Sequence, residues 1–121
     1  MAKELVVYTR ATPCRHVTRT RHDLTTKGLA FREIDIDADP AAAKLLEEWT
    51  GYQPVPTVLV AEAGSDEPIH PPAALTPNQS PRNADRGSMI SEPDTENLMV
   101  FLEHNGFVKV NLFRMGSFLR G

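Results

Sequence analysis

Short apolar segments in the first half of the chain predict three β-strands. Residues 5–8 are apolar or aromatic throughout, and the run is too short for a helix, so it predicts a buried strand. Residues 31–36 alternate apolar and polar side chains, which is the period of a strand with one face inward. Residues 57–60 form the third apolar run and predict a third strand.

The two segments between these strands have the three- and four-residue spacing of amphipathic helices. Nothing breaks a helix from residue 14 to 27, and Gly28 then supplies a C-terminal glycine signal. The second helix begins with Asp39 as its N-cap and Pro40 at its first position, and Gly51 ends it. The faces expected to be buried consist of Val17, Thr20, Leu24 and Thr25 in the first helix and Ala42, Leu45, Leu46 and Trp49 in the second.

The alternation of strands and helices predicts an α/β fold whose first two strands are parallel. The composition changes at residue 62, because residues 62–86 contain five prolines and only Ile69 and Leu75 as large aliphatic side chains. Such a segment buries little and pairs poorly as a strand. We interpret it as a long mobile loop, a feature that is uncommon inside a domain and often functional or disordered.

Regular structure returns after this loop. Residues 87–90 predict a short fourth strand, and Ser91 with Asp94 forms a capping arrangement for a third helix. Asn105-Gly106 ends that helix, and its apolar stripe consists of Leu98, Phe101 and Leu102. Residues 107–121 form a C-terminal extension in which apolar side chains alternate irregularly with cations. We expect it to pack on the domain or on a second subunit, with a basic amphipathic membrane contact as the alternative.

Length and charge then narrow the function classes. The 121 residues fit one domain over residues 1–121, and the formal net charge of −3 does not indicate a nucleic-acid partner or an anionic membrane. No apolar run reaches the roughly 18 residues of a membrane span, and residues 1–4 lack the layout of a signal peptide. We therefore expect a cytoplasmic protein, a monomer or weak dimer, whose lone cysteine stays reduced and builds no zinc site by itself.

Cys14 is the only cysteine, and it stands where the first predicted helix begins. Arg10, Arg15 and Arg19 flank it closely. The positive end of a helix and neighbouring cations both favour the thiolate form, which is the reactive one. A lone cysteine is otherwise often a small buried apolar side chain. A reactive thiol is the functional hypothesis, and a buried hydrophobe is the alternative.

The same residues also contain parts of a phosphatase loop. In such a loop a cysteine precedes backbone amides and an arginine that together bind an oxyanion. Here Arg19 follows Cys14 with one intervening residue fewer than that signature requires. A phosphate or arsenate enzyme is therefore an alternative with the wrong spacing.

The surroundings of Cys14 are similar to those of glutaredoxins. The similarity rests on residues 6–10, 14–28, 31–36 and 55–58. It covers about residues 4–61 and 87–106, but neither the proline-rich loop nor the C-terminal extension. Residues 39–43 and 55–58 are most similar to the mycoredoxin-like branch of that family.

This resemblance implies a thioredoxin/glutaredoxin fold: an α/β domain of order βαβαββα with a four-stranded mixed sheet and a long loop before the last strand. It implies a cis peptide bond between Val55 and Pro56, in a loop that faces the catalytic Cys14. In such proteins the exposed backbone of this loop pairs with the bound thiol compound or partner chain, a form of strand addition.

Three further residues are implied in substrate binding. Arg10 matches a family lysine near the thiolate and the glutathione carboxylate, and the arginine fork suits a carboxylate. Ser91 occupies the family position at which a helix N-terminus holds the γ-glutamyl end of glutathione, although a plain helix cap also explains it. His16 would serve as a cation or proton donor, or be simply an exposed histidine.

Four departures from the family pattern limit the chemistry. Val17 replaces the second cysteine, Arg15 follows Cys14 where the family has Pro or Gly, and Pro54 replaces the threonine before Val55-Pro56. The turn between Tyr8 and Cys14 is also one residue longer. We therefore expect a monothiol thiol–disulfide oxidoreductase, without a resident cofactor or metal, that acts on glutathione-like or protein mixed disulfides with a low-molecular thiol as co-substrate.

Two non-enzymatic functions remain open. Monothiol relatives hold an iron–sulfur cluster between two subunits, but their usual Cys-Gly-Phe-Ser sequence is absent here. The chain could also be a thioredoxin-fold binding module without redox activity.

Overall fold

The computed structural model describes residues 2–12 and 14–109. The elements are β1 (Lys3–Thr9), α1 (Arg15–Thr26), β2 (Phe31–Asp35), α2 (Pro40–Thr50), β3 (Thr57–Glu62), β4 (Met89–Ser91) and α3 (Thr95–His104). Among the described residues the strands form one sheet in the order β2-β1-β3-β4. Strand β1 is parallel to β2 and antiparallel to β3, and β4 is antiparallel to β3. The predicted α/β fold of order βαβαββα, with a four-stranded mixed sheet, is confirmed.

Strand β1 lies between two partners along nearly its whole length. Tyr8 is opposite Ile34 of β2 and also opposite Thr57, the first residue of β3. Because β1 and β3 are antiparallel, the end of β1 and the beginning of β3 meet at one edge of the sheet. The segment that leads to Cys14 and the segment that contains Pro56 therefore start from the same edge.

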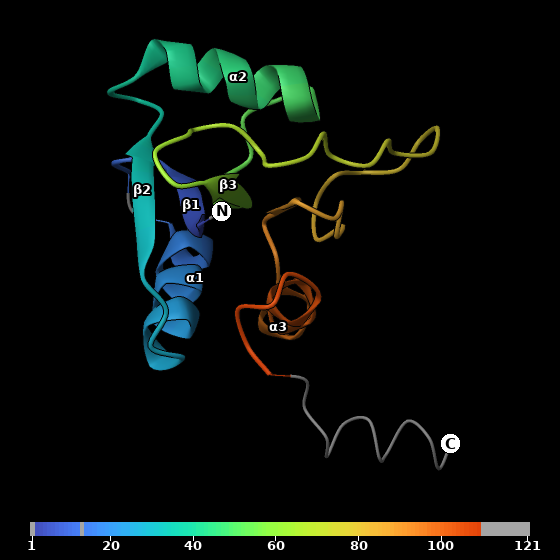
Figure 1. Cartoon of the computed structure of the whole chain (residues 1–121). Coiled ribbons are helices and arrows are strands. Elements are labelled where there is room, and N and C mark those ends of the chain that lie inside the picture. The colour runs from blue at the N-terminus through green and yellow to red at the C-terminus, as the bar shows by residue number, and fades with distance from the viewer. Residues whose placement is uncertain (1, 13, 110–121) are drawn as a thin grey trace.

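Helices cover both faces of the sheet (Figure 1). Helix α2 lies on one face, and α1 and α3 lie on the other. Alternate residues of β1 serve the two sides: Val6 and Tyr8 pack in the cluster under α2, whereas Leu5 and Val7 pack in the cluster under α1 and α3. Burial on both faces explains why β1 is a continuous apolar run rather than an alternating one.

The predicted helix signals correspond to the structure. Cys14 is the N-cap of α1, and Asp39 caps α2 by accepting a hydrogen bond from the Ala42 N–H at 3.1 Å. Gly51 follows α2 with φ of 87°, a left-handed conformation that glycine adopts readily. The buried residues of these helices are Val17, Thr20 and Leu24 in α1 and Ala42 and Leu46 in α2; Leu45 and Trp49 are half-buried, and Thr25 is exposed.

The predictions after residue 86 need two corrections. The fourth strand is Met89–Ser91 rather than 87–90, because Gly87 has φ of 85° and cannot continue a strand. Ser91 ends β4 instead of capping a helix. Asp94 is the N-cap of α3, and its carboxylate accepts from the Asn97 N–H at 2.7 Å.

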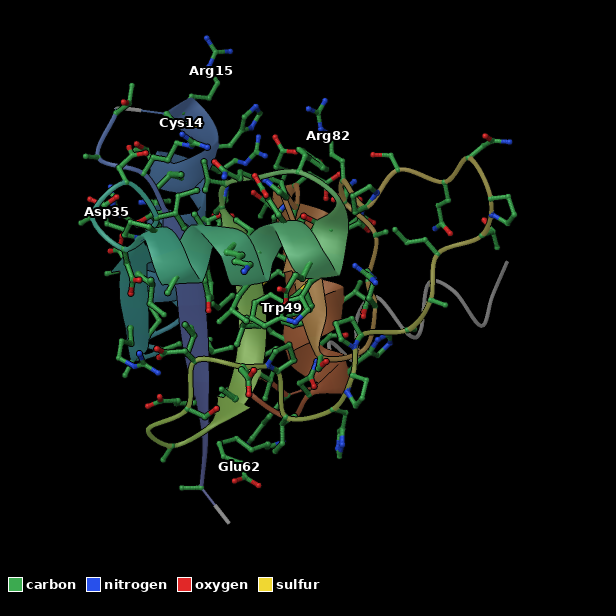
Figure 2. All side chains as sticks on the ribbon, turned by 90° about the horizontal axis from the view of Figure 1, so that it is seen from above. Cys14, Arg15, Asp35, Trp49, Glu62 and Arg82 are labelled. Carbon is green, nitrogen blue, oxygen red and sulfur yellow. The ribbon has the colours of Figure 1, made fainter. Side chains whose placement is uncertain are left out.

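The proline-rich connection between β3 and β4 is tied to the rest of the fold near both of its ends. Its middle part extends away from the body in both views (Figures 1 and 2). Near its start, the Ile69 N–H donates to the Val60 carbonyl at 2.8 Å. Near its end, Arg86 donates to the carbonyls of Trp49 at 2.7 Å and Ala73 at 2.9 Å, and burial lowers the pKa of its guanidinium. The predicted mobility of this segment is not tested by these contacts.

Two residues that follow α3 contact the core. Phe107 and Val108 pack against the core under α1 and α3, and residues 110–121 of the predicted C-terminal extension lie outside the described residues. None of the helices in the described part of the chain has the length and hydropathy to cross a membrane. The prediction of a single domain over residues 1–121 stays a prediction.

Replacing Arg86 with methionine should destabilise the protein. The change leaves the carbonyls of Trp49 and Ala73 without their donor, which should lower the free energy of unfolding by about 1–3 kcal/mol in a urea titration. Lys44→Met is the matched control, since Lys44 is exposed on α2. Equal unfolding free energies for the two variants would contradict the anchoring role of Arg86.

Candidate active site

Cys14 lies at the junction between the end of β1 and the start of α1. It is a free, half-buried cysteine with extended backbone angles, φ −142° and ψ 127°. Its carbonyl accepts from the Thr18 N–H at 3.0 Å and from the Thr18 hydroxyl at 3.1 Å. Cys14 therefore opens the first turn of α1, at the positive end of the helix dipole, but its side chain makes no capping hydrogen bond there.

A cavity of about 360 Å³ opens beside Cys14. It lies between the β1–α1 connection, α1 and the end of β2, and its lining consists of Thr9, Arg10, Ala11, Thr12, Cys14, Val17, Thr18, Arg21, Glu33 and Asp35. The structure thus brings Arg10 and Cys14 to one cavity. Two arginines and two carboxylates in its lining make it a polar site.

The two arginines of this cavity differ in their partners. Arg21 makes a bidentate pair with Glu33, in which Nη2 donates to Oε1 at 2.7 Å and Nε donates to Oε2 at 3.1 Å, and this hydrogen bonding raises the pKa of Arg21. Arg10 donates to Gln53 at 2.6 Å and, at 3.3 Å, to Asp37. Arg21 is thus matched to a carboxylate, whereas Arg10 has one long ion pair and one neutral partner.

The Val55–Pro56 peptide bond is cis, as the resemblance implied. Pro56 is buried and Val55 is half-buried. The Pro56 carbonyl accepts from the Glu92 N–H at 2.7 Å, and the Thr57 hydroxyl donates to the Pro54 carbonyl at 2.8 Å. These bonds hold the cis-Pro loop between β3 and the residues that precede α3.

Arg19 of α1 connects the segment before α3 to the surroundings of Cys14. Arg19 donates to the Pro93 carbonyl at 3.0 Å, and its guanidinium lies 3.3 Å from the ring Nδ1 of His16, which is exposed. Arg15 points away from the body at the same edge (Figure 2). Since Arg15 and Arg19 belong to a continuous helix, the phosphatase-loop alternative is wrong.

Ser91 and Val17 are both buried, each exposed by only 2%. The Ser91 hydroxyl is 2.9 Å from the Thr57 hydroxyl, so this side chain is already paired inside the sheet. Val17 lines the cavity beside Cys14.

Sequence reasoning missed several polar residues around the cis-Pro loop. Gln53, the partner of Arg10, precedes Pro54 directly, and that position next to a predicted functional loop was a usable signal. Tyr52 donates to Glu92 at 3.0 Å, and burial together with this bond raises the pKa of Tyr52. Nothing in the sequence pairs Tyr52 with Glu92, because the contact depends on the course of the chain between β3 and α3.

No group of three His, Cys, Asp or Glu side chains that could hold a metal ion occurs within residues 2–12 and 14–109.

Comparison with known families agrees with this geometry. The profile of the glutaredoxin family matches residues 5–63, which include Cys14 and the cis-Pro loop. A search of curated proteins gave no significant match. Together with the four-stranded mixed sheet and the helices on both of its faces, the match over residues 5–63 supports a glutaredoxin-like protein with a thioredoxin fold.

Proposed function

We propose that this protein is a thiol–disulfide oxidoreductase that works by a monothiol mechanism through Cys14. The family match supports an oxidoreductase of this general type. The observation that carries the proposal is the position of Cys14 at the N-cap of α1, at the sheet edge that also holds the cis Val55–Pro56 peptide. The substrates are disulfides of low-molecular thiols or of proteins.

The first step is an exchange at sulfur. The Cys14 thiolate attacks one sulfur of the substrate disulfide, a bond forms between the two sulfurs, and the other substrate sulfur leaves as a thiolate that takes a proton from water. Cys14 is the N-cap residue of α1, so the attacking thiolate would lie at the positive end of the helix dipole. The backbone of the cis-Pro loop would align the substrate chain by strand addition.

The second step needs an external thiol. Cys14 is the only cysteine of the chain, and Val17 stands where a resolving cysteine would be. A low-molecular thiol therefore attacks the mixed disulfide on Cys14, releases the reduced Cys14 and leaves with the substrate moiety as a new disulfide. No resident cofactor is required for either step.

Arg10 is proposed to bind a carboxylate of the low-molecular thiol. It lines the cavity beside Cys14, and its Nη2 is held by a neutral amide rather than by a carboxylate. An incoming carboxylate would thus gain a charged partner without displacing a short ion pair.

Replacing Cys14 with serine should abolish the exchange. We expect no turnover above background with a mixed disulfide of glutathione and a small thiol, since the hydroxyl cannot form the mixed disulfide. The measurement is the steady-state rate in the presence of glutathione and a reductase. Equal rates for wild type and Cys14→Ser would contradict the enzymatic proposal and favour a binding module.

Replacing Arg10 with glutamine should affect substrates selectively. We expect kcat/KM to fall about five- to tenfold for a glutathione mixed disulfide, because a charge-assisted hydrogen bond is lost. With a neutral substrate such as hydroxyethyl disulfide, assayed as a single exchange with Cys14, the rate constant should fall less than twofold. This substrate has no carboxylate for Arg10 to bind, and a surface charge without such a partner contributes little. The matched control is Arg21→Gln, which removes an arginine already paired with Glu33. Equal losses for both substrates would contradict the proposed role of Arg10.

A further inference from the structure

The connection between β3 and β4 brings one more basic side chain to the edge that holds Cys14. Figure 2 shows Arg82 and Cys14 at the same edge of the molecule, with the Arg82 side chain directed outward. Arg82 belongs to the proline-rich connection and lies outside the residues that match the glutaredoxin family. The family match therefore says nothing about Arg82.

The backbone around Arg82 is fixed against the segment that leads into α3. Arg82 forms a β-bridge with Ser91, and the Asn83 N–H donates to the Ser91 carbonyl at 2.6 Å. The Asn83 side chain bonds to Asp94 in both directions, at 2.8 and 3.0 Å. Since Ser91 is itself paired with Thr57, the position of Arg82 is set relative to the cis-Pro loop.

Glu92 holds the Arg82 side chain on one side only. The Arg82 Nε donates to the Glu92 carboxylate at 3.1 Å, and the same carboxylate accepts from the Tyr52 hydroxyl at 3.0 Å. The Glu92 side chain is only 13% exposed, whereas the Arg82 side chain is 66% exposed. The Tyr52 hydroxyl also interacts with the Arg82 guanidinium, but the 66% exposure of the Arg82 side chain leaves its outer N–H groups facing solvent.

The backbone of Glu92, the residue that holds Arg82, has an energetically unfavourable conformation. Its φ is +45°, a left-handed conformation that disfavours residues other than glycine. Strained residues of this kind cluster at ligand sites. The Glu92 N–H also donates to the Pro56 carbonyl, so one residue links the cis-Pro loop to the orientation of Arg82.

Two further arginines lie near this pair, together with the Asp94 carboxylate that bonds to Asn83. Arg19 contacts the Pro93 carbonyl, next to Glu92, and Arg15 extends from the same edge. Neither arginine forms an ion pair with a carboxylate among the described residues. A negatively charged substrate at this edge would therefore meet arginines that are not already neutralised by an ion pair.

We propose that Arg82 is a specificity-determining residue that binds a carboxylate of the disulfide substrate lying along the Val55–Pro56 peptide. The preferred substrate is a peptide or protein disulfide with an Asp or Glu close to the reacting cysteine. The inference rests on the exchange proposed above: the Cys14 thiolate bonds to the cysteine sulfur of the acidic peptide, and the other sulfur leaves as a thiolate with no net oxidation or reduction.

The test compares two peptides that differ only by Asp or Asn beside the cysteine, each as a mixed disulfide with 2-mercaptoethanol. The measured quantity is the second-order rate constant of a single exchange with reduced Cys14. For wild type we expect the Asp peptide to react about three to five times faster, the size of a favourable surface charge contact. In Arg82→Gln the ratio should fall close to one, and in Arg82→Lys most of it should remain.

The matched control is Lys44→Gln, which removes one positive charge from an exposed position on α2 and should keep the wild-type ratio. High salt should reduce the ratio, because exposed charges are screened. A wild-type ratio of one, or the same ratio in Arg82→Gln and Lys44→Gln, overturns the role of Arg82. An unstructured cysteine peptide serves as a separate reference: if wild type reacts no faster than this peptide, the proposed catalytic function fails, while the ratio still decides the role of Arg82.

Discussion

The pairing of β1 with two neighbours is the constraint on which the rest of the structure depends. Tyr8 is opposite both Ile34 and Thr57, so the strand is fixed in register from either side. A shift by one residue would turn Val6 and Tyr8 away from α2 and expose the wrong set of side chains to each core. The same register brings the segment before Cys14 and the segment that contains Pro56 to one edge.

The positive charge available at that edge depends on which arginines are already paired with carboxylates. Arg21 is matched to Glu33 by a bidentate contact and contributes mainly to local order. The partners of the other arginines are weaker: Arg10 has a long ion pair and a neutral amide, Arg19 a backbone carbonyl, and Arg82 a carboxylate on one side. Arg15 forms no ion pair among the described residues. Individually such exposed charges contribute roughly 0–1 kcal/mol, so their combined effect on a substrate is one of selection rather than of tight binding.

Much of this architecture could be predicted from the sequence, because its signals are local. Asp39, Pro40 and Gly51 mark α2 through capping and glycine chemistry that operate within a few residues. The β1 run is recognisable because it is buried on both faces. The placement of Cys14 at a helix N-terminus follows from these local signals as well.

What the sequence could not reveal depends on contacts between distant segments. The assignment of Ser91 to a helix cap was wrong because the hydroxyl is paired with Thr57, which lies 34 residues earlier. The residue type of Glu92 does not predict its left-handed backbone conformation. Its contacts with Tyr52 and Arg82 depend on the path of the proline-rich connection. The composition of the proline-rich connection predicts that it buries little, but it does not indicate which of its polar residues contact the site.

The central claim is that Cys14 forms a mixed disulfide rapidly and that an external thiol removes it. Quenched-flow mass spectrometry of the reduced protein mixed with glutathione disulfide tests this directly. The account predicts one glutathione adduct per chain, on Cys14, formed at least about tenfold faster than on an unstructured cysteine peptide at neutral pH, and lost again when reduced glutathione is added. An adduct that forms no faster than on the peptide, or that persists in excess glutathione, would contradict it.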